Sequence, residues 1–175
     1  MNPVDWRLRR AGAGDEAALA LVAAATFLET YAGIVSRDDM LAHCATKCSA
    51  GYFGAWIASA DHLLTLSEHP DGAAPLGFTA LTPPDFPVAF GPETIELRRI
   101  YVLTTAHGSG LGAALMERAV EDARGLGKAR LALGVHPGNV RARAFYERHG
   151  FRIVGERRFQ VGAAVFADPV YARAI

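Results

Sequence analysis

The sequence lacks the features that mark several classes of protein. No apolar run reaches the about 18 residues that a membrane span requires, so no membrane partner is predicted. The start, MNPVDWRLRR, has no apolar signal core, which predicts a protein that is not exported and acts in the cytoplasm. Only two cysteines occur, Cys44 and Cys48, and we expect both to be buried and reduced. No metal site is predicted, because the neighbouring His43 would point about 100° away from them on a helix.

Neither sign of charge is in excess, since 18 basic residues balance 18 acidic ones. Nucleic acid is therefore disfavoured as a partner, and the basic residues are not interleaved with a stacking platform. The balance conceals a division: residues 1–96 hold five basic and twelve acidic residues, whereas residues 97–175 hold thirteen and six. Either this is a chance distribution over solvated faces, or the second half handles an anionic ligand and the first half attracts a cationic one.

The length of 175 residues suits one hydrophobic core, which predicts a single domain over residues 1–175. No internal repeat is present, and helical and alternating patterns follow one another as in a mixed α/β domain. Strands are predicted at residues 4–10, 62–68, 75–82, 94–103, 125–135 after a turn, 151–161 and 168–175. Helices are predicted from residue 14 to about Glu29, from the N-cap Ser36, from about Ser49 to Ala60, from the glycine turn to about Arg124, and up to Gly150. The proline-dense segment Thr82–Pro92 is predicted as an exposed loop.

The stretch HGSGLGAALMERA, residues 107–119, places a glycine-rich turn between a strand and a helix. Its glycines read G-x-G-x-G, so they match neither the dinucleotide-binding fingerprint nor the P-loop. A turn of backbone N–H groups that leads into a helix N-terminus suits a pyrophosphate. The alternative is a turn that merely connects the strand to the helix.

A second motif follows about 30 residues later, in NVRARAFYERHGF. With it the chain resembles the GNAT superfamily of acyl-CoA-dependent N-acyltransferases. That family's pattern Asn-x-x-Ala-x-x-x-Tyr followed by Gly-Phe is matched by Asn139, Ala142, Tyr146, Gly150 and Phe151. Its phosphate loop, Gln/Arg-x-x-Gly-x-Gly/Ala, is matched at His107, Gly110 and Gly112, with histidine in place of the usual first residue.

The resemblance implies a fold and a set of ligand contacts. The fold is a single α/β domain with a mixed, mostly antiparallel sheet of six to seven strands, flanked by about four helices. The cosubstrate is acetyl-CoA, with no metal. Its contacts are the backbone of Ile100, Tyr101 and Val102, the turn formed by His107, Gly108, Ser109, Gly110, Leu111, Gly112 and Ala113, and the α-helical residues Asn139, Ala142 and Tyr146.

The resemblance also implies catalytic roles. Tyr146 would face the sulfur as general acid, although it could be a core aromatic with its hydroxyl at the surface. Glu96 would handle the amine proton through water, and its position four residues before Ile100 predicts that both point to one face of the strand. The alternative for Glu96 is a carboxylate paired with a neighbouring arginine. Glu29 and Tyr31 would line the acceptor site, although Tyr31 could simply pack.

The function predicted is transfer of an acetyl group to a primary amine of a small, cationic, polyamine-like acceptor. One alternative is acetylation of a peptide N-terminus or a lysine, which would need an open groove that the loop Thr82–Pro92 could cover. Another is an acyl-CoA-binding sensor without turnover. The protein is predicted to be a monomer or a homodimer.

Overall fold

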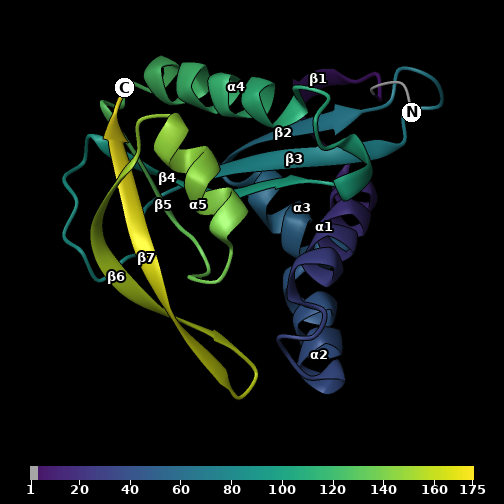
Figure 1. The fold of residues 1–175 in the computed structure, drawn as a ribbon. Helices are drawn as coiled ribbons and strands as arrows, with labels where there is room; N and C mark the ends of the chain where they lie inside the picture. The colour runs from purple at the N-terminus through teal and green to yellow at the C-terminus, as the bar shows by residue number, and fades with distance from the viewer. Residues whose placement is uncertain (1–3) are drawn as a thin grey trace.

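The computed structural model describes residues 4–175, and a seven-stranded sheet forms its centre (Figure 1). The strands lie in the order β1-β2-β3-β4-β5-β7-β6, and all neighbours are antiparallel except β4 and β5. The strands are β1 (Arg7–Arg10), β2 (Leu63–Glu68), β3 (Pro75–Thr82), β4 (Thr94–Val102), β5 (Arg130–Gly134), β6 (Arg152–Val161) and β7 (Ala164–Ala174). The helices are α1 (Glu16–Tyr31), α2 (Arg37–Lys47), α3 (Ala50–Ala58), α4 (Leu111–Gly125), α5 (Val140–Arg148) and the 3-10 turn η1 (Thr104–Ala106).

Side-chain caps explain where three of the helices begin. The hydroxyl of Ser36 accepts a hydrogen bond from the backbone N–H of Asp39 at 3.1 Å, and that of Ser49 accepts one from Tyr52 at 3.2 Å. The side-chain oxygen of Asn139 does the same for Ala142 at 3.0 Å. Each cap satisfies a donor that the first turn of a helix leaves without a partner.

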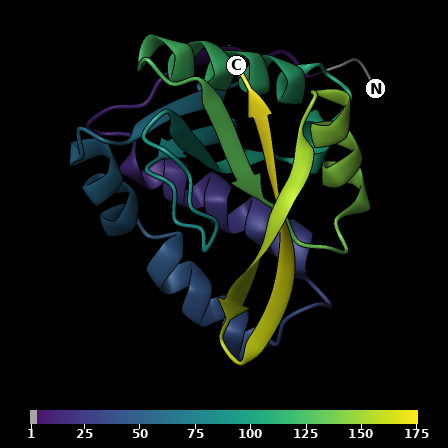
Figure 2. The same cartoon turned by 90° about the vertical axis from the view of Figure 1, so that its left-hand side faces the viewer.

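The helices cover the two faces of the sheet and enclose two main apolar clusters. On one face, Leu19 and Phe27 of α1 and Phe53 of α3 pack against β2 and β3. On the other face, Met116 of α4 and Tyr146 of α5 pack against β4, β5 and β7. The hairpin of β6 and β7 reaches beyond the rest of the sheet toward α2 (Figure 2). None of the helices within residues 4–175 combines the length and the apolarity needed to cross a membrane.

The structure confirms the predicted mixed α/β fold and moves several boundaries. The first strand begins at Arg7 rather than residue 4, and the first helix continues to Tyr31. The prediction that the protein is not exported rests on residues 1–10, and residues 1–3 of this segment lie outside the described part of the chain. The last strand begins at Ala164 rather than Asp168, because β6 and β7 continue their ladder up to the turn at Gly162.

Candidate active site

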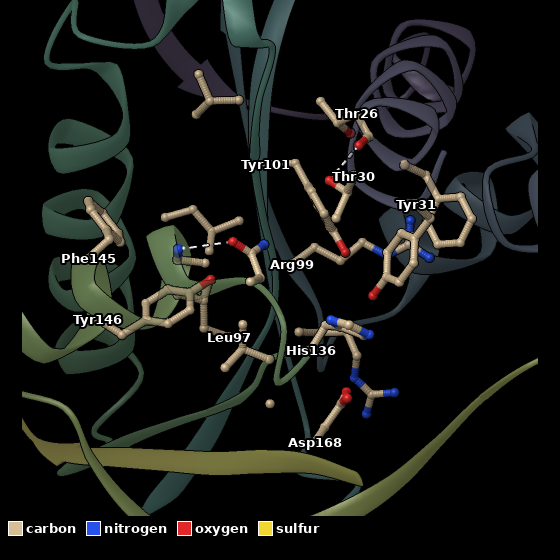
Figure 3. A pocket seen from close by; sticks show the side chains of 18 of the residues that line it. Thr26, Thr30, Tyr31, Leu97, Arg99, Tyr101, His136, Phe145, Tyr146 and Asp168 are labelled. Carbon is tan, nitrogen blue, oxygen red and sulfur yellow. Dashed lines mark hydrogen bonds between the residues drawn. The ribbon is translucent and has the colours of Figure 1, made fainter. Parts of the chain in front are cut away.

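The site begins where the parallel strands β4 and β5 separate. Their ladder joins only Thr94–Glu96 to Arg130–Ala132 within the described chain, whereas β4 continues to Val102. Beyond Glu96, the edge of β4 that faces β5 therefore offers backbone N–H and C=O groups without ladder partners. A cavity of about 1340 Å³ opens there, lined by α1, β4, the glycine turn, α5 and the β6–β7 hairpin (Figure 3).

The glycine turn closes one end of this cavity. Gly108 and Gly110 have φ angles of 82° and 84°, which glycine adopts far more readily than other residues. No described atom lies within 4 Å of the positions that Cβ atoms would take on these two residues, so the turn faces open space. The N–H groups of Gly112 and Ala113 belong to the first turn of α4, where the helix provides no acceptor. Together with the positive end of the helix dipole, they suit a pyrophosphate.

Two other residues of the predicted turn support its shape. The hydroxyl of Ser109 donates to the carbonyl of Ala106 at 2.7 Å, and its own carbonyl accepts from the indole of Trp6 at 3.1 Å. Leu111 is fully buried under the turn. These contacts hold the backbone of the turn in place, while its glycines face the cavity.

The histidine at the head of the turn holds an arginine of α5. Nε2 of His107 donates to the carbonyl of Val102 at 3.0 Å, and Nδ1 accepts from the guanidinium of Arg141. This pattern requires a neutral ring, and burial and the charge of Arg141 lower the pKa of His107 accordingly. A side-chain cation therefore does lie beside the turn, but it comes from α5. The carbonyl of Val102, a predicted pantetheine contact, already has a partner in His107.

The two predicted contacts of α5 face the same cavity. Asn139 uses its side-chain carbonyl to cap the helix, which leaves its NH₂ group as a donor. Ala142 also lines the cavity. Tyr146 is 8% exposed, and its ring reaches toward the cavity from α5 (Figure 3). Burial raises the pKa of Tyr146, so its hydroxyl keeps its proton at neutral pH.

The expectation that Glu96 and Ile100 share a face is wrong. A β-bulge between Ala80 and Leu81 in the pairing of β3 with β4 adds one residue to β4, at Arg98. Ile100 therefore packs in the same cluster as Ile95 and Leu97, on the α5 side of the sheet. Tyr101 packs on the opposite side, toward α1 and α3.

Glu96 lies behind the cavity wall in a network of arginines. It is fully buried, and its Oε1 accepts from Arg157 at 3.2 Å. Its Oε2 accepts from Arg98 at 2.8 Å and from the backbone N–H of Asp85 at 3.0 Å. Burial raises the pKa of the Glu96 carboxyl, and the two arginines oppose this effect. Both arginines are among the residues that line the cavity. Its partners are two guanidinium groups and an amide N–H, which do not accept a proton, so a proton can pass between Glu96 and the cavity only through water.

The structure separates Glu29 from Tyr31. The carboxylate of Glu29 accepts from the N–H of Thr104 at 3.1 Å and from its hydroxyl at 2.8 Å, so it lies near the glycine turn. Tyr31 is 6% exposed and lies with its ring edge against His136, 5.8 Å between centroids. Figure 3 shows its hydroxyl pointing toward His136 and Asp168. Only Tyr31 therefore lies at the end of the cavity opposite the turn.

Three residues that line this end of the cavity were not predicted from the sequence: Asp168, Arg157 and His136. Asp168 of β7 is 2% exposed and faces Arg157, its cross-strand partner in β6. His136 follows β5, and its ring lies 4.6 Å from that of Phe166. No motif marks these residues, because they meet only through the pairing of β5, β6 and β7. Asp168 is one of six acidic residues in the basic half of the chain, so its charge alone did not single it out.

The lining of the cavity is mainly basic, because few of the acidic residues of the first half of the chain reach it. Its lining includes three acidic residues, Glu29, Asp85 and Asp168, and seven basic ones, Lys47, Arg98, Arg99, Arg141, Arg148, Arg157 and Arg158. Most acids of the first half lie elsewhere, for example Asp15 and Glu68, which both pair with Arg9. Cys48 is buried and Cys44 half-buried, both as free thiols. No group of three or more metal-ligating side chains gathers within residues 4–175.

Comparisons with known proteins agree with this geometry. Residues 36–151 match the model of the acetyltransferase (GNAT) family. A protein of Mycobacterium tuberculosis described as an uncharacterized N-acetyltransferase is 32% identical over 155 residues, which cover 89% of this chain and 94% of that protein. A similarly described protein of Archaeoglobus fulgidus is 30% identical over 72% of this chain and 82% of its own length. Among solved structures, the PaiA N-acetyltransferase of Thermoplasma acidophilum in complex with coenzyme A superposes with a TM-score of 0.80, 21% identity, and coverage of 98% and 99%.

Proposed function

This chain belongs to the acetyltransferase (GNAT) family, and we propose that it transfers an acetyl group from acetyl-CoA to the primary amine of a small acceptor. It is an acyl-CoA-dependent N-acyltransferase. The observation that carries the proposal is the separation of β4 from β5, with the glycine turn at one end of the cavity and Tyr146 beside it. The open backbone of β4 and the empty space above the turn fit the pantetheine and pyrophosphate of the cosubstrate.

The chain's own residues would divide the work as follows. The N–H groups of Gly112 and Ala113 and the guanidinium of Arg141 hold phosphate oxygens, since a helix N-terminus and an arginine both favour anions. The bound cosubstrate supplies a thioester, which a neutral amine can attack. Tyr146 donates its proton to the departing thiolate, and Glu96 takes the amine proton through water.

The walls of the cavity favour a small acceptor. Phe86 and Asp85 of the loop between β3 and β4 line the cavity, and Phe86 stacks under the guanidinium of Arg157 at 5.3 Å. The loop therefore forms a wall where a peptide would need an open groove. Because arginines outnumber carboxylates in the lining, a second ammonium would meet repulsion. We therefore propose that the acceptors include monoamines as well as the polyamine-like molecules predicted from the sequence.

A screen of amines with acetyl-CoA, followed by release of free thiol, tests this function. The panel contains polyamines, alkyl monoamines, amino acids and short peptides. We expect turnover with at least one small amine and a loss of about 10²-fold in kcat for Tyr146→Phe, with unchanged affinity for CoA. The matched control is Tyr171→Phe, which removes a buried hydroxyl bonded to Glu147 outside the cavity and should keep kcat. Binding of CoA without turnover of any amine or peptide would contradict the proposal.

A further inference from the structure

Asp168 has a carboxylate oxygen without a partner. Its side chain is 3% exposed, and its Oδ2 lies 3.8 Å from Nε of Arg157, which is beyond hydrogen-bond distance. Within residues 4–175, its Oδ1 has no hydrogen-bond partner, and neither has Nε of Arg157. A buried charged oxygen without a donor is costly, so such a group in a native structure calls for a reason.

The charged groups next to Asp168 form a row of ion pairs that ends at its carboxylate. Ion pairs link Asp85 to Arg98, Arg98 to Glu96, Glu96 to Arg157, and Arg157 to Asp168. This row contains three carboxylates and two guanidinium groups, and the carboxylate at its end faces the cavity. Glu96, in the middle of the row, has donors on both oxygens. Asp168, at the end, is the member that lacks one.

The nearest additional titratable group, His136, supplies no hydrogen bond to Oδ1 of Asp168 within the described residues. The ring of His136 accepts a hydrogen bond from the N–H of Gly138 on Nδ1 at 3.1 Å, which places the proton of the neutral ring on Nε2.

Aromatic rings complete the surroundings of the carboxylate. Tyr31 and Tyr101 line the same cavity as Asp168 (Figure 3). Figure 3 shows Tyr31, His136 and Asp168 around one part of the cavity. Aromatic faces attract an alkylammonium ion and pack against its carbon chain, whereas they offer little to a strongly hydrated anion.

We infer that the carboxylate of Asp168 binds the acceptor amine in its ammonium form, before the proton leaves through water to Glu96 and the neutral amine attacks, and that the acceptor is an alkyl or arylalkyl primary monoamine whose chain packs against Tyr31 and Tyr101. The inference rests on the proposed function, to which it adds the residue that recognises the acceptor. The ammonium completes the row of alternating charges, and the second charge of a polyamine would lie among the arginines of the same wall. Asp168 is thus a substrate-binding residue at the end of the cavity opposite the glycine turn.

The variant Asp168→Asn tests this inference, because it keeps the size of the side chain and removes its charge. We expect the KM for the best monoamine of the screen to rise at least about tenfold, as a charge-assisted hydrogen bond is lost. The Kd for CoA should stay within about twofold, since the phosphate end of the cavity is unchanged. Burial raises the pKa of Asp168, which means that its charged form is unfavourable in the folded protein. The Tm of Asp168→Asn at pH 7 should therefore equal or exceed that of the wild type.

A binding measurement separates this inference from the proposed function. Wild type and Asp168→Asn are titrated by NMR with n-butylammonium chloride and with n-butanol, its uncharged counterpart. We expect the ammonium to bind the wild type at least about tenfold more tightly than the variant, and n-butanol to bind both equally. The control Asp122→Asn removes a carboxylate paired with Arg10 outside the cavity lining and should bind like the wild type.

The outcomes are distinct. Binding of n-butylammonium that depends on Asp168, without turnover of any amine, would contradict the proposed function and leave the inference standing. An unchanged KM and unchanged ammonium binding in Asp168→Asn would overturn the inference while turnover by the wild type still supports the function. A fall in Tm together with weaker CoA binding would show a structural role for Asp168 and would also overturn the inference.

Discussion

Replacing Gly134 with alanine tests whether Arg157 holds the buried carboxylates of the site together. Gly134 is in β5, and a Cβ added to it would lie 2.5 Å from Cζ and Nε of Arg157. Ordinary contacts between such atoms begin at about 3.5 Å, so the guanidinium would have to move by about 1 Å. Its hydrogen bond to Glu96, now 3.2 Å, would then be lost.

The size of the effect follows from the burial of Glu96. A hydrogen bond to a charged group contributes about 1.5–3 kcal/mol, and Glu96 keeps its second arginine, Arg98. Alanine in place of glycine restores about 0.5–1 kcal/mol by restricting the unfolded chain. We therefore expect Gly134→Ala to lose about 1–2 kcal/mol of unfolding free energy, which corresponds to about 3–6 °C in Tm for a domain of this size.

Denaturant unfolding and calorimetry measure this change in stability. Two further variants serve as controls for its cause. Gly51→Ala, in α3, places a Cβ where no described atom lies within 4 Å and should be neutral or stabilising. In the double variant Gly134→Ala with Glu96→Gln, the cost should be smaller than the sum of the single changes, because a neutral side chain needs Arg157 less. Strict additivity, or an unchanged Tm in Gly134→Ala, would refute the argument.

Three further predictions concern the glycine turn and the pH dependence of stability. Gly110→Ala should weaken CoA binding, measured by calorimetry, because alanine at a φ of 84° is strained by about 1 kcal/mol and its methyl group enters the space above the turn; normal affinity would contradict the phosphate-loop assignment. Arg141→Gln should raise the Kd for CoA about tenfold by removing the cation that His107 holds, whereas Arg152→Gln, exposed and outside the cavity, should not. Burial and nearby cations lower the pKa of His43 from 6.5 to about 4. Between these two pH values the unfolded chain binds more protons than the folded one, so the free energy of unfolding should fall as the pH drops from about 6.5 to 4. His43→Gln should make the free energy of unfolding less dependent on pH in this range.

Local signals in the sequence predicted most of the elements. Ser36 is a good N-cap in front of a helical pattern and serves as the cap in the structure, and Ser49, the predicted start of the next helix, caps it. The Asp-Gly pair between β2 and β3 marks a hairpin, and the two strands pair as expected. Boundaries failed where tertiary pairing extended an element, as in β7, whose first residues form a ladder with β6 despite a weak strand pattern.

The faces of β4 could not be predicted from its sequence. A regular strand would place Glu96 and Ile100 together, but the bulge at Arg98 reverses the alternation between them. No turn or proline marks this bulge in the segment TIELRRIYV. The bulge arises from the register with β3, which is a property of the assembled sheet.

What the sequence determined by itself is the order of elements and the glycine turn at one end of the cavity. The glycines of the turn, Asn139 and Tyr146 belong to two motifs that are local in the chain, so the resemblance to the family was enough to predict that they meet at one cavity. The tertiary structure alone decided the opposite end. Asp168, Arg157 and His136 come from three segments that meet because β7 lies between β5 and β6, and their charges and missing partners exist only after the sheet has formed. Residues that are far apart in the sequence can interact only after folding has buried them in one cavity, so their spacing along the chain does not predict the interaction.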